Sequence, residues 1–350
     1  MVASRLLGAG GNARARSMLG CVLLASLGAC GGKTELDAGN AVAPPASLAR
    51  VCPAPETVVL VREDEGFHRL ALDATHVYWT TDRKVRRVAK CGGAPETVAT
   101  LTYAAFDLDV ARGFVYFAEP HFGGGVRRVA TRGGAISEVF VPAGPPRGVL
   151  VAGGFAYATT LVTGSSFSEL EAVRIDGGEP FTRFKGNGYD VAADDEFVYA
   201  SAEATNPSDR AIVRLAHADG NAEVLVSPAA ARDLAVDRSH VYWLEPSPGG
   251  GQPIRIRSAP KSPGAPITDL AVSDTYALRI AADPLDAREG GRVYFTNHTE
   301  GTVLGVAKRG GPLVTISTEA PIAEDLRADE SSVYFVSFRD GTISRRDAPP

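Results

Sequence analysis

The sequence lacks several features that would assign it to a common class of protein. It has only four cysteines, two methionines and two tryptophans in 350 residues, and its 36 basic side chains do not exceed its 41 acidic ones. The resulting formal net charge of −5 argues against a nucleic-acid partner. No stretch reaches the roughly 18 to 20 apolar residues that a membrane-spanning helix needs. The motifs G-x-S-x-G, G-x-x-x-x-G-K-[ST] and H-E-x-x-H are also missing, so the commonest nucleophile, phosphate and zinc-protease signatures are excluded.

Glycine and proline, by contrast, are abundant, with 38 and 23 copies. Hydrophobic residues make up 45% and charged residues 22% of the chain, which is an ordinary balance for a folded protein. This composition favours many short strands joined by tight turns over a helical bundle.

Residues 1–29 have the pattern of an export signal. They contain three arginines and no acidic residue, and 18–29 form a short apolar stretch. The stretch runs into Leu27-Gly28-Ala29-Cys30, which resembles the lipobox of bacterial lipoproteins. The resemblance implies cleavage after Ala29 and acylation of Cys30, and several acyl chains anchor a protein far better than one. The alternative is cleavage by an ordinary signal peptidase, which would leave a soluble secreted protein.

The predicted mature chain begins with a tether and continues into one folded domain. Removing the signal changes the formal net charge from −5 to −8, because three arginines and no acids are lost. Residues 30–55 are rich in Gly, Ala and Pro and are expected to form a flexible tether from the lipid to a folded domain over 56–350. We therefore expect a lipoprotein anchored in a membrane of the cell envelope. Because Gly31 rather than aspartate follows Cys30, the outer membrane is favoured, with the protein facing the periplasm or the cell surface.

Two cysteines remain once Cys21 has left with the signal and Cys30 carries lipid. In an oxidising export compartment, Cys52 and Cys91 are candidates for a disulfide. Neither belongs to a C-x-x-C pair, so they do not indicate a structural metal site.

Seven copies of one pattern fill the rest of the chain. Each copy has a tyrosine in a short apolar run, and successive tyrosines lie 38, 41, 42, 43, 52 and 40 residues apart, with an insertion near 284–290 in the long interval. The tyrosines are Tyr78, Tyr116, Tyr157, Tyr199, Tyr242, Tyr294 and Tyr334. Each copy contains four strand-like runs, which in the first copy are 69–72, 77–80, 85–89 and 96–100. Such a repeat predicts an all-β fold, a seven-bladed β-propeller of four-stranded antiparallel blades. The third copy is degenerate, which keeps six blades as the alternative.

The two ends of the folded domain are expected to close the ring. The seventh copy stops after the run 342–346, whereas 52–58 (CPAPETV) matches 91–98 (CGGAPETV) of the first copy. Residues 56–61 are therefore predicted to form the outer strand of the last blade, which would remove an exposed sheet edge. The same closure would place Cys52 and Cys91 on one face, where a disulfide would clamp the seam.

The run Val77-Tyr78-Trp79-Thr80-Thr81-Asp82 resembles the YWTD signature of lipoprotein-receptor propellers. The aspartates Asp73 and Asp237, each five residues before a tyrosine, are similar to those of TolB-like periplasmic propellers and lipoproteins. This resemblance covers roughly 56–348 and implies the fold. It implies no particular function, because propellers serve as binding proteins, hydrolases, lyases and dehydrogenases. Both families usually have six blades.

Candidate ligand residues gather at the predicted mouth of the central channel. They stand nine positions before each tyrosine, corrected for the insertion, and are Arg69, Asp107, Gly148, Asp190, Asp233, Arg279 and Asp325, with His68 and Arg147 beside them. One interpretation is a ring of carboxylates that holds a hard cation or a cationic ligand. The other is that each aspartate accepts backbone amides of the neighbouring loop, with the arginines partly neutralising the ring. The repetition favours the second, because a substrate site needs different groups from different blades.

A second column stands five positions before the tyrosines, again corrected for the insertion, and consists of Asp73, Asp194, Asp237, Asp283 and Asp329. These aspartates are expected to cap their own turns through hydrogen bonds to the backbone. The tyrosines are expected in the packed core, with their hydroxyls bonded between blades.

Histidines offer a weaker candidate site. His68, His121 and His298 fall on loops that are expected near the mouth, where three histidines from different blades would suit a metal ion. Their spacing does not single out such a site, so we predict no catalytic residue and no cofactor and leave open one divalent cation at the mouth. The expected function is a lipid-anchored, non-catalytic binding or scaffolding module for a protein, peptide or glycan. The alternative is a metal-dependent hydrolase or lyase with its site at the channel mouth.

Overall fold

The computed structural model describes residues 52–349 apart from 53, 55, 65, 68, 162–167, 187–189, 203–209, 219 and 248–252. The regular structure in these residues consists of β-strands. Within this part of the chain there is no helix long and apolar enough to cross a membrane. The predicted signal (1–29), Cys30 and almost all of the tether (30–55) lie outside the described residues.

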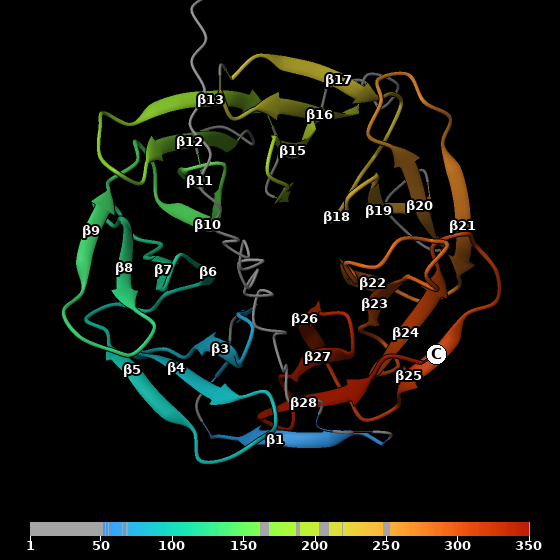
Figure 1. Cartoon of the computed structure of the whole chain (residues 1–350), viewed down its shortest axis with the longest axis horizontal. Coiled ribbons are helices and arrows are strands. Elements are labelled where there is room, and N and C mark those ends of the chain that lie inside the picture. The colour runs from blue at the N-terminus through green and yellow to red at the C-terminus, as the bar shows by residue number, and fades with distance from the viewer. Residues whose placement is uncertain are drawn as a thin grey trace, which may run out of the picture. The chain divides into compact units, whose positions relative to one another are not determined.

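Seven four-stranded antiparallel sheets stand around a central axis (Figure 1). Blade 1 comprises β2 (Leu70–Leu72), β3 (His76–Thr80), β4 (Lys84–Ala89) and β5 (Glu96–Thr100). Blade 2 comprises β6 (Asp107–Ala111), β7 (Phe114–Ala118), β8 (Val126–Ala130) and β9 (Ser137–Phe140). Blade 3 comprises β10 (Pro146–Ala152), β11 (Phe155–Leu161), β12 (Ser168–Arg174) and β13 (Phe181–Gly186). The degenerate third copy therefore forms a complete blade.

The remaining blades follow the same plan. Blade 4 comprises β14 (Val191–Ala193), β15 (Phe197–Ala202), β16 (Ala211–Ala216) and β17 (Ala222–Val226). Blade 5 comprises β18 (Leu234–Val236), β19 (His240–Pro246), β20 (Ile254–Pro260) and β21 (Thr268–Ser273). Blade 6 comprises β22 (Ala277–Ala282), β23 (Arg292–Asn297), β24 (Thr302–Ala307) and β25 (Val314–Ser317). Blade 7 comprises β26 (Ala323–Ala328), β27 (Ser332–Ser337), β28 (Thr342–Asp347) and β1 (Val58–Arg62). The prediction of seven blades is confirmed, and the six-bladed alternative is wrong.

The first and last parts of the domain meet in blade 7, as predicted. Strand β1 pairs antiparallel with β28, with Val58 opposite Arg345 and Arg62 opposite Thr342. The chain is also tied at this seam by a Cys52–Cys91 disulfide, whose Cα atoms are 5.3 Å apart. Because Cys91 belongs to blade 1 and Cys52 leads into β1 of blade 7, the disulfide links the two blades on either side of the closure.

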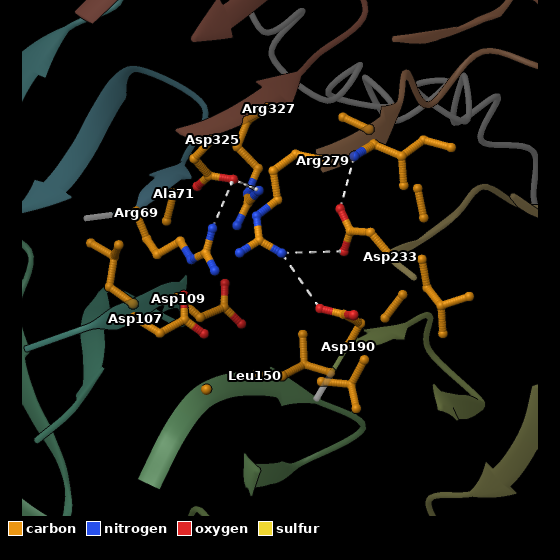
Figure 2. Close-up of a pocket in the computed structure, with 18 of the residues that line it drawn as sticks. Arg69, Ala71, Asp107, Asp109, Leu150, Asp190, Asp233, Arg279, Asp325 and Arg327 are labelled. Atoms are coloured by element: carbon orange, nitrogen blue, oxygen red, sulfur yellow. Dashed lines mark hydrogen bonds and ion pairs between the residues drawn. The ribbon is translucent and has the colours of Figure 1, made fainter. Parts of the chain in front are cut away.

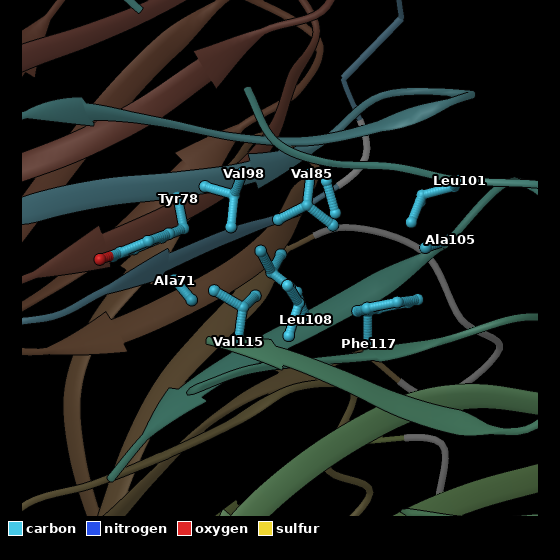
Figure 3. Packing of buried hydrophobic residues seen from close by; sticks show 11 residues of the cluster. Ala71, Tyr78, Val85, Val98, Leu101, Ala105, Leu108, Val115 and Phe117 are labelled. Carbon is cyan, nitrogen blue, oxygen red and sulfur yellow. The ribbon is translucent and has the colours of Figure 1, made fainter. Parts of the chain in front are cut away.

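The conserved spacing within each copy reflects one register. The apolar residue eight positions before the tyrosine pairs with the residue that follows it, as Leu70 does with Trp79 and Leu326 with Phe335. All seven tyrosines are at most 1% exposed. Between blades 1 and 2, Tyr78 packs in one cluster with Leu108 and other apolar side chains (Figure 3). Each such burial stabilises the fold by about 1.5 to 3 kcal/mol, so each blade depends on its neighbour.

The turn aspartates have the capping role that was predicted. Asp73 accepts the backbone amides of Thr75 and His76, each at 2.7 Å. Its other oxygen accepts the Tyr78 hydroxyl at 2.7 Å. The same tyrosine–aspartate bond recurs for the pairs Tyr199–Asp194, Tyr242–Asp237 and Tyr334–Asp329. The prediction that the hydroxyls bond between blades is therefore wrong for these four tyrosines, because both partners belong to one hairpin. Tyr157 does bond between blades, with its hydroxyl 2.6 Å from His217 Nδ1.

Lysines tie several of these aspartates to the next blade. Each lysine follows the third strand of its blade and reaches back to the preceding one. The pairs are Lys90–Asp329, Lys261–Asp194 and Lys308–Asp237 at 2.8, 2.5 and 2.8 Å. Only the last is fully enclosed, with the side chains of Lys308 and Asp237 0% and 1% exposed. We call these three pairs the blade latches.

Candidate functional site

The axis of the propeller contains a cavity of about 960 Å³. All seven residues of the column nine positions before the tyrosines line it, and so does Arg147. The sequence therefore identified a set of residues that the fold does bring together. These residues lie near the start of the innermost strands, so every blade contributes to one chamber (Figure 2).

Three charged residues of the chamber were missed. Asp109, Glu324 and Arg327 also line the cavity. Residues two apart in a strand share a face, so the column seven positions before each tyrosine points the same way. That column is alanine or leucine in five copies and charged only at Asp109 and Arg327. These two charged residues in an otherwise apolar column could have identified Asp109 and Arg327 as cavity residues from the sequence.

The histidines do not join this site. His121 and His298 are not among the residues that line the cavity. His121 instead stacks with Tyr103 at 4.1 Å between ring centroids, and His298 packs against Tyr276. The expectation that they converge at the mouth is wrong, and His68 lies outside the described residues. Across the described residues, no three His, Cys, Asp or Glu side chains are arranged to hold a metal ion.

Most of the aspartates form hydrogen bonds across the interfaces between neighbouring blades, which we call seams. Asp325 Oδ2 accepts the Leu70 amide of the next blade at 2.8 Å. The same bond joins Val149 to Asp107 at 2.9 Å and Ile280 to Asp233 at 2.8 Å. This matches the structural interpretation of the column, since each carboxylate satisfies an amide at the edge of the neighbouring innermost strand.

Asp190 departs from this rule. In the part of the chain that the structure describes, it accepts no equivalent amide from blade 5. Its nearest cation is Arg279, with Nη1 3.5 Å from its Oδ1. Asp190 is therefore the carboxylate of the column that can move without opening a seam.

Blade 3 has a glycine, Gly148, at the position where the other six blades have an aspartate or an arginine. A Cβ atom at this position would lie 2.6 Å from Thr159 Oγ1 and 3.3 Å from Asp107 Oδ2. Any side chain would therefore press on the carboxylate that accepts the Val149 amide. The absence of charge at this one position of the column follows from packing.

The arginines neutralise the ring in part. Arg327 Nη1 donates to Asp325 Oδ1 at 2.8 Å, and Arg69 Nη1 lies 4.0 Å from the same oxygen. Arg279 Nη1 is 4.0 Å from Asp233 Oδ1 in addition to its contact with Asp190. The side chains of Arg69, Arg279 and Arg327 remain 25%, 18% and 37% exposed.

Enclosure of the aspartates shifts their titration. Burial raises the pKa of Asp107 to about 6, although Arg69 and the Val149 amide oppose this. Burial, together with the nearby charge of Asp233, raises the pKa of Asp190 to about 7 against the opposing effect of Arg279. Burial also raises the pKa values of Asp109 and Asp233. Near neutral pH the chamber is therefore less negative than its formal charge, because arginines stay protonated.

No protein-family model matches this sequence, and no curated protein matches it. Solved propellers do resemble its structure. The WD40 β-propeller domain of Doa1 is 11% identical with a TM-score of 0.61, over 85% of this chain and 97% of that one. Hydrazine synthase of Kuenenia stuttgartiensis is 12% identical with a TM-score of 0.61, over 82% and 97%. A catalytically inactive virginiamycin B lyase from Staphylococcus aureus, solved with quinupristin, is 14% identical with a TM-score of 0.60, over 84% and 99%. Similarity at this level establishes a β-propeller fold and leaves function to be argued from the chamber.

Proposed function

We propose that this chain is a lipid-anchored β-propeller of the bacterial cell envelope that binds a partner at the mouth of its central chamber without catalysing a reaction. One observation carries the binding role: charged groups from all seven blades converge on a single cavity of about 960 Å³. A cavity with convergent polar groups is the usual form of a binding site. Most of its carboxylates are held by backbone amides, an arrangement that suits recognition better than proton transfer.

Aromatic side chains at the cavity support a polypeptide partner over a glycan. Phe106 and Phe338 line it and are still 38% and 49% exposed. The Arg147 guanidinium lies 5.7 Å from the centre of the Phe106 ring. Partly exposed aromatic residues next to arginine are enriched in protein interfaces. The proposed partner is therefore a protein or peptide.

The anchor is supported by the sequence Leu27-Gly28-Ala29-Cys30. In cells fed an alkyne-labelled fatty acid, the wild-type protein should carry the label and sediment with membranes. Cys30→Ala should lose both properties. Cys21→Ala is the matched control, because this cysteine lies in the predicted signal, and it should behave like wild type. Membrane sedimentation of Cys30→Ala at the wild-type level would contradict the anchor, which we place in the outer membrane.

Photo-crosslinking in cells tests the binding role. A benzophenone amino acid replaces Phe106 at the cavity or, as a control, Ile136. Ile136 has a similar exposure of 37% but lies in the turn between β8 and β9, away from the innermost strands. A discrete protein adduct from position 106 alone is expected. No adduct, or equal adducts from both positions, would contradict the proposal.

The enzymatic alternative has its own readout. A metal-dependent hydrolase or lyase would keep a stoichiometric divalent ion through dialysis against a weak chelator. Elemental analysis of the purified full-length protein should find none above the level of a buffer blank. A retained equimolar metal would favour the alternative.

A further inference from the structure

Charge is distributed unevenly around the central chamber. Its three innermost arginines, Arg279, Arg327 and Arg69, come from blades 6, 7 and 1, which are consecutive around the ring. Their guanidinium groups point toward one another from that side (Figure 2). The aspartates of blades 2, 4 and 5 face them across the chamber. One side of the cavity thus carries three guanidinium groups around the carboxylate of Asp325, and we call it the arginine side.

The arginine side has more donors than nearby acceptors. Each guanidinium carries five N–H donors, yet the contacts within the described residues all use a single nitrogen, Nη1. From Arg279 these contacts reach carboxylates at 3.5 and 4.0 Å. From Arg69 they reach the Glu324 carbonyl at 3.3 Å and Asp325 at 4.0 Å. Charge-assisted bonds of this type are normally about 2.7 to 2.9 Å long. Only Arg327 reaches that range, with bonds from Nη1 to Asp325 Oδ1 at 2.8 Å and to the Leu326 carbonyl at 2.9 Å.

The resident carboxylates cannot close these gaps. Asp325 and Asp233 each hold the amide of the next blade with one oxygen. Moving either toward an arginine would break a seam bond and leave a buried amide without an acceptor, at about 1 to 3 kcal/mol. Asp190, which holds no such amide, is placed to leave Arg279 when another carboxylate arrives.

We infer that the arginine side binds a carboxylate of an acidic peptide segment of the partner, with Arg69, Arg279 and Arg327 donating to it. This inference rests on the proposed binding function and names the chemistry that is recognised. Carboxylates already contact all three guanidiniums, so an incoming one matches their geometry and can be held by two nitrogens of one arginine. No covalent step is involved.

Binding should be linked to protonation of Asp190. The charged groups that act on this carboxyl are Asp233, Arg279, Arg69 and Arg232. When the ligand carboxylate pairs with Arg279, Asp190 loses its nearest cation, and the pKa of Asp190 rises further. Affinity should therefore rise as pH falls from 8 to 6, where an acidic peptide is still ionised.

The test uses the mature protein, purified from membranes in neutral detergent, and a fluorescein-labelled hexaglutamate peptide whose binding is followed by fluorescence anisotropy. Hexaglutamine with the same label is the uncharged control, and inorganic phosphate is the competitor. Non-specific attraction cannot produce binding, because the predicted mature chain has a net charge of −8 and repels the peptide. Saturable binding of hexaglutamate alone is expected. Equal binding of hexaglutamine would overturn the inference, and complete displacement by phosphate at equimolar concentration would assign the site to phosphate instead.

Variants locate the binding. Arg327→Gln, which alters the most exposed of the three arginines, should weaken binding by about tenfold or more. Arg174→Gln is the control, because Arg174 ends β12 and does not line the cavity. Asp190→Asn should bind more tightly at pH 8 and remove most of the pH dependence. Thermal melting verifies that each variant is folded, and unchanged affinity in folded Arg327→Gln and Arg279→Lys would overturn the inference. Such a result leaves the crosslinking and metal assays untouched, so failure of the ligand chemistry and failure of the binding function can be told apart.

Discussion

The latch between Lys308 and Asp237 provides the sharpest test of how the blades are joined. Lys308 Nζ lies 2.8 Å from Asp237 Oδ2 and 3.2 Å from Asp283 Oδ1, and its side chain is fully buried. It also donates to the Asp283 carbonyl at 2.6 Å. Lys308→Met keeps an unbranched side chain that is shorter by one atom, but it removes the cation from two enclosed carboxylates. Removing one partner of a buried pair costs about 3 to 5 kcal/mol, and we expect a loss of unfolding free energy in this range.

Two sister latches are the matched controls. The side chain of Lys261 is 12% exposed and that of its partner 26%, and the values for Lys90 and its partner are 15% and 25%. Water screens these pairs, so Lys261→Met and Lys90→Met should each cost only about 1 kcal/mol. Urea unfolding is followed by the fluorescence of Trp79 and Trp243, both fully buried. A Lys308→Met midpoint equal to that of Lys90→Met would refute the reasoning.

The pH dependence gives an independent readout of the same latch. Burial alone would raise the pKa of Asp237, but hydrogen bonds from Lys308, Tyr242 and the Ser239 amide outweigh it and lower the pKa to about 2. Against an ordinary value of 3.8, this contributes about 2 kcal/mol of stability. The contribution is present above about pH 4 and is lost as pH falls through 2. Lys308→Met should lose less stability than wild type over this window.

Three further perturbations probe the seam, one turn and the chamber. The Cys52–Cys91 disulfide joins residues 39 positions apart in the sequence. Its reduction should lower the free energy of unfolding by about 4 kcal/mol, as measured by urea unfolding with and without reductant. Gly341→Ala would bring Cβ within 2.2 Å of a backbone carbonyl at φ +60°, whereas Gly113→Ala, at φ +79°, meets nothing within 4 Å. The second should cost about 1 kcal/mol and the first clearly more, and equal melting temperatures would contradict this. Because the pKa of Asp190 is raised to about 7, its protonation favours the fold, so wild type should gain stability as pH falls from 8 to 5. Asp190→Asn should gain less stability than wild type over this range, and the remaining gain should come from Asp107, whose pKa is raised to about 6. Thermal melts across this pH range will show the difference.

The positions of the blades could be predicted because each blade is specified by residues that are close together in the sequence. A tyrosine, a turn aspartate five residues before it and alternating apolar residues specify one hairpin whatever surrounds it, which is why Asp73 caps its turn as expected. The outer strand was predictable for the same reason, since 52–58 repeats the sequence of an outer strand elsewhere. The direction of the Tyr78 hydroxyl was not, because it depends on whether Asp73 or a neighbouring blade is nearer in space.

By itself, the sequence determined the fold, the closure and the column of residues that faces the axis, because strand periodicity and repeat length are properties of short segments. Only the tertiary structure decided what the column does. It added Asp109 and Arg327 to the chamber and tied three aspartates to seam amides. It also left Asp190 without an amide among the described residues and gathered three arginines on one side. These relations join residues from separate copies, such as Asp190 and Arg279, which are 89 positions apart. Their distances follow from how whole blades pack around the axis.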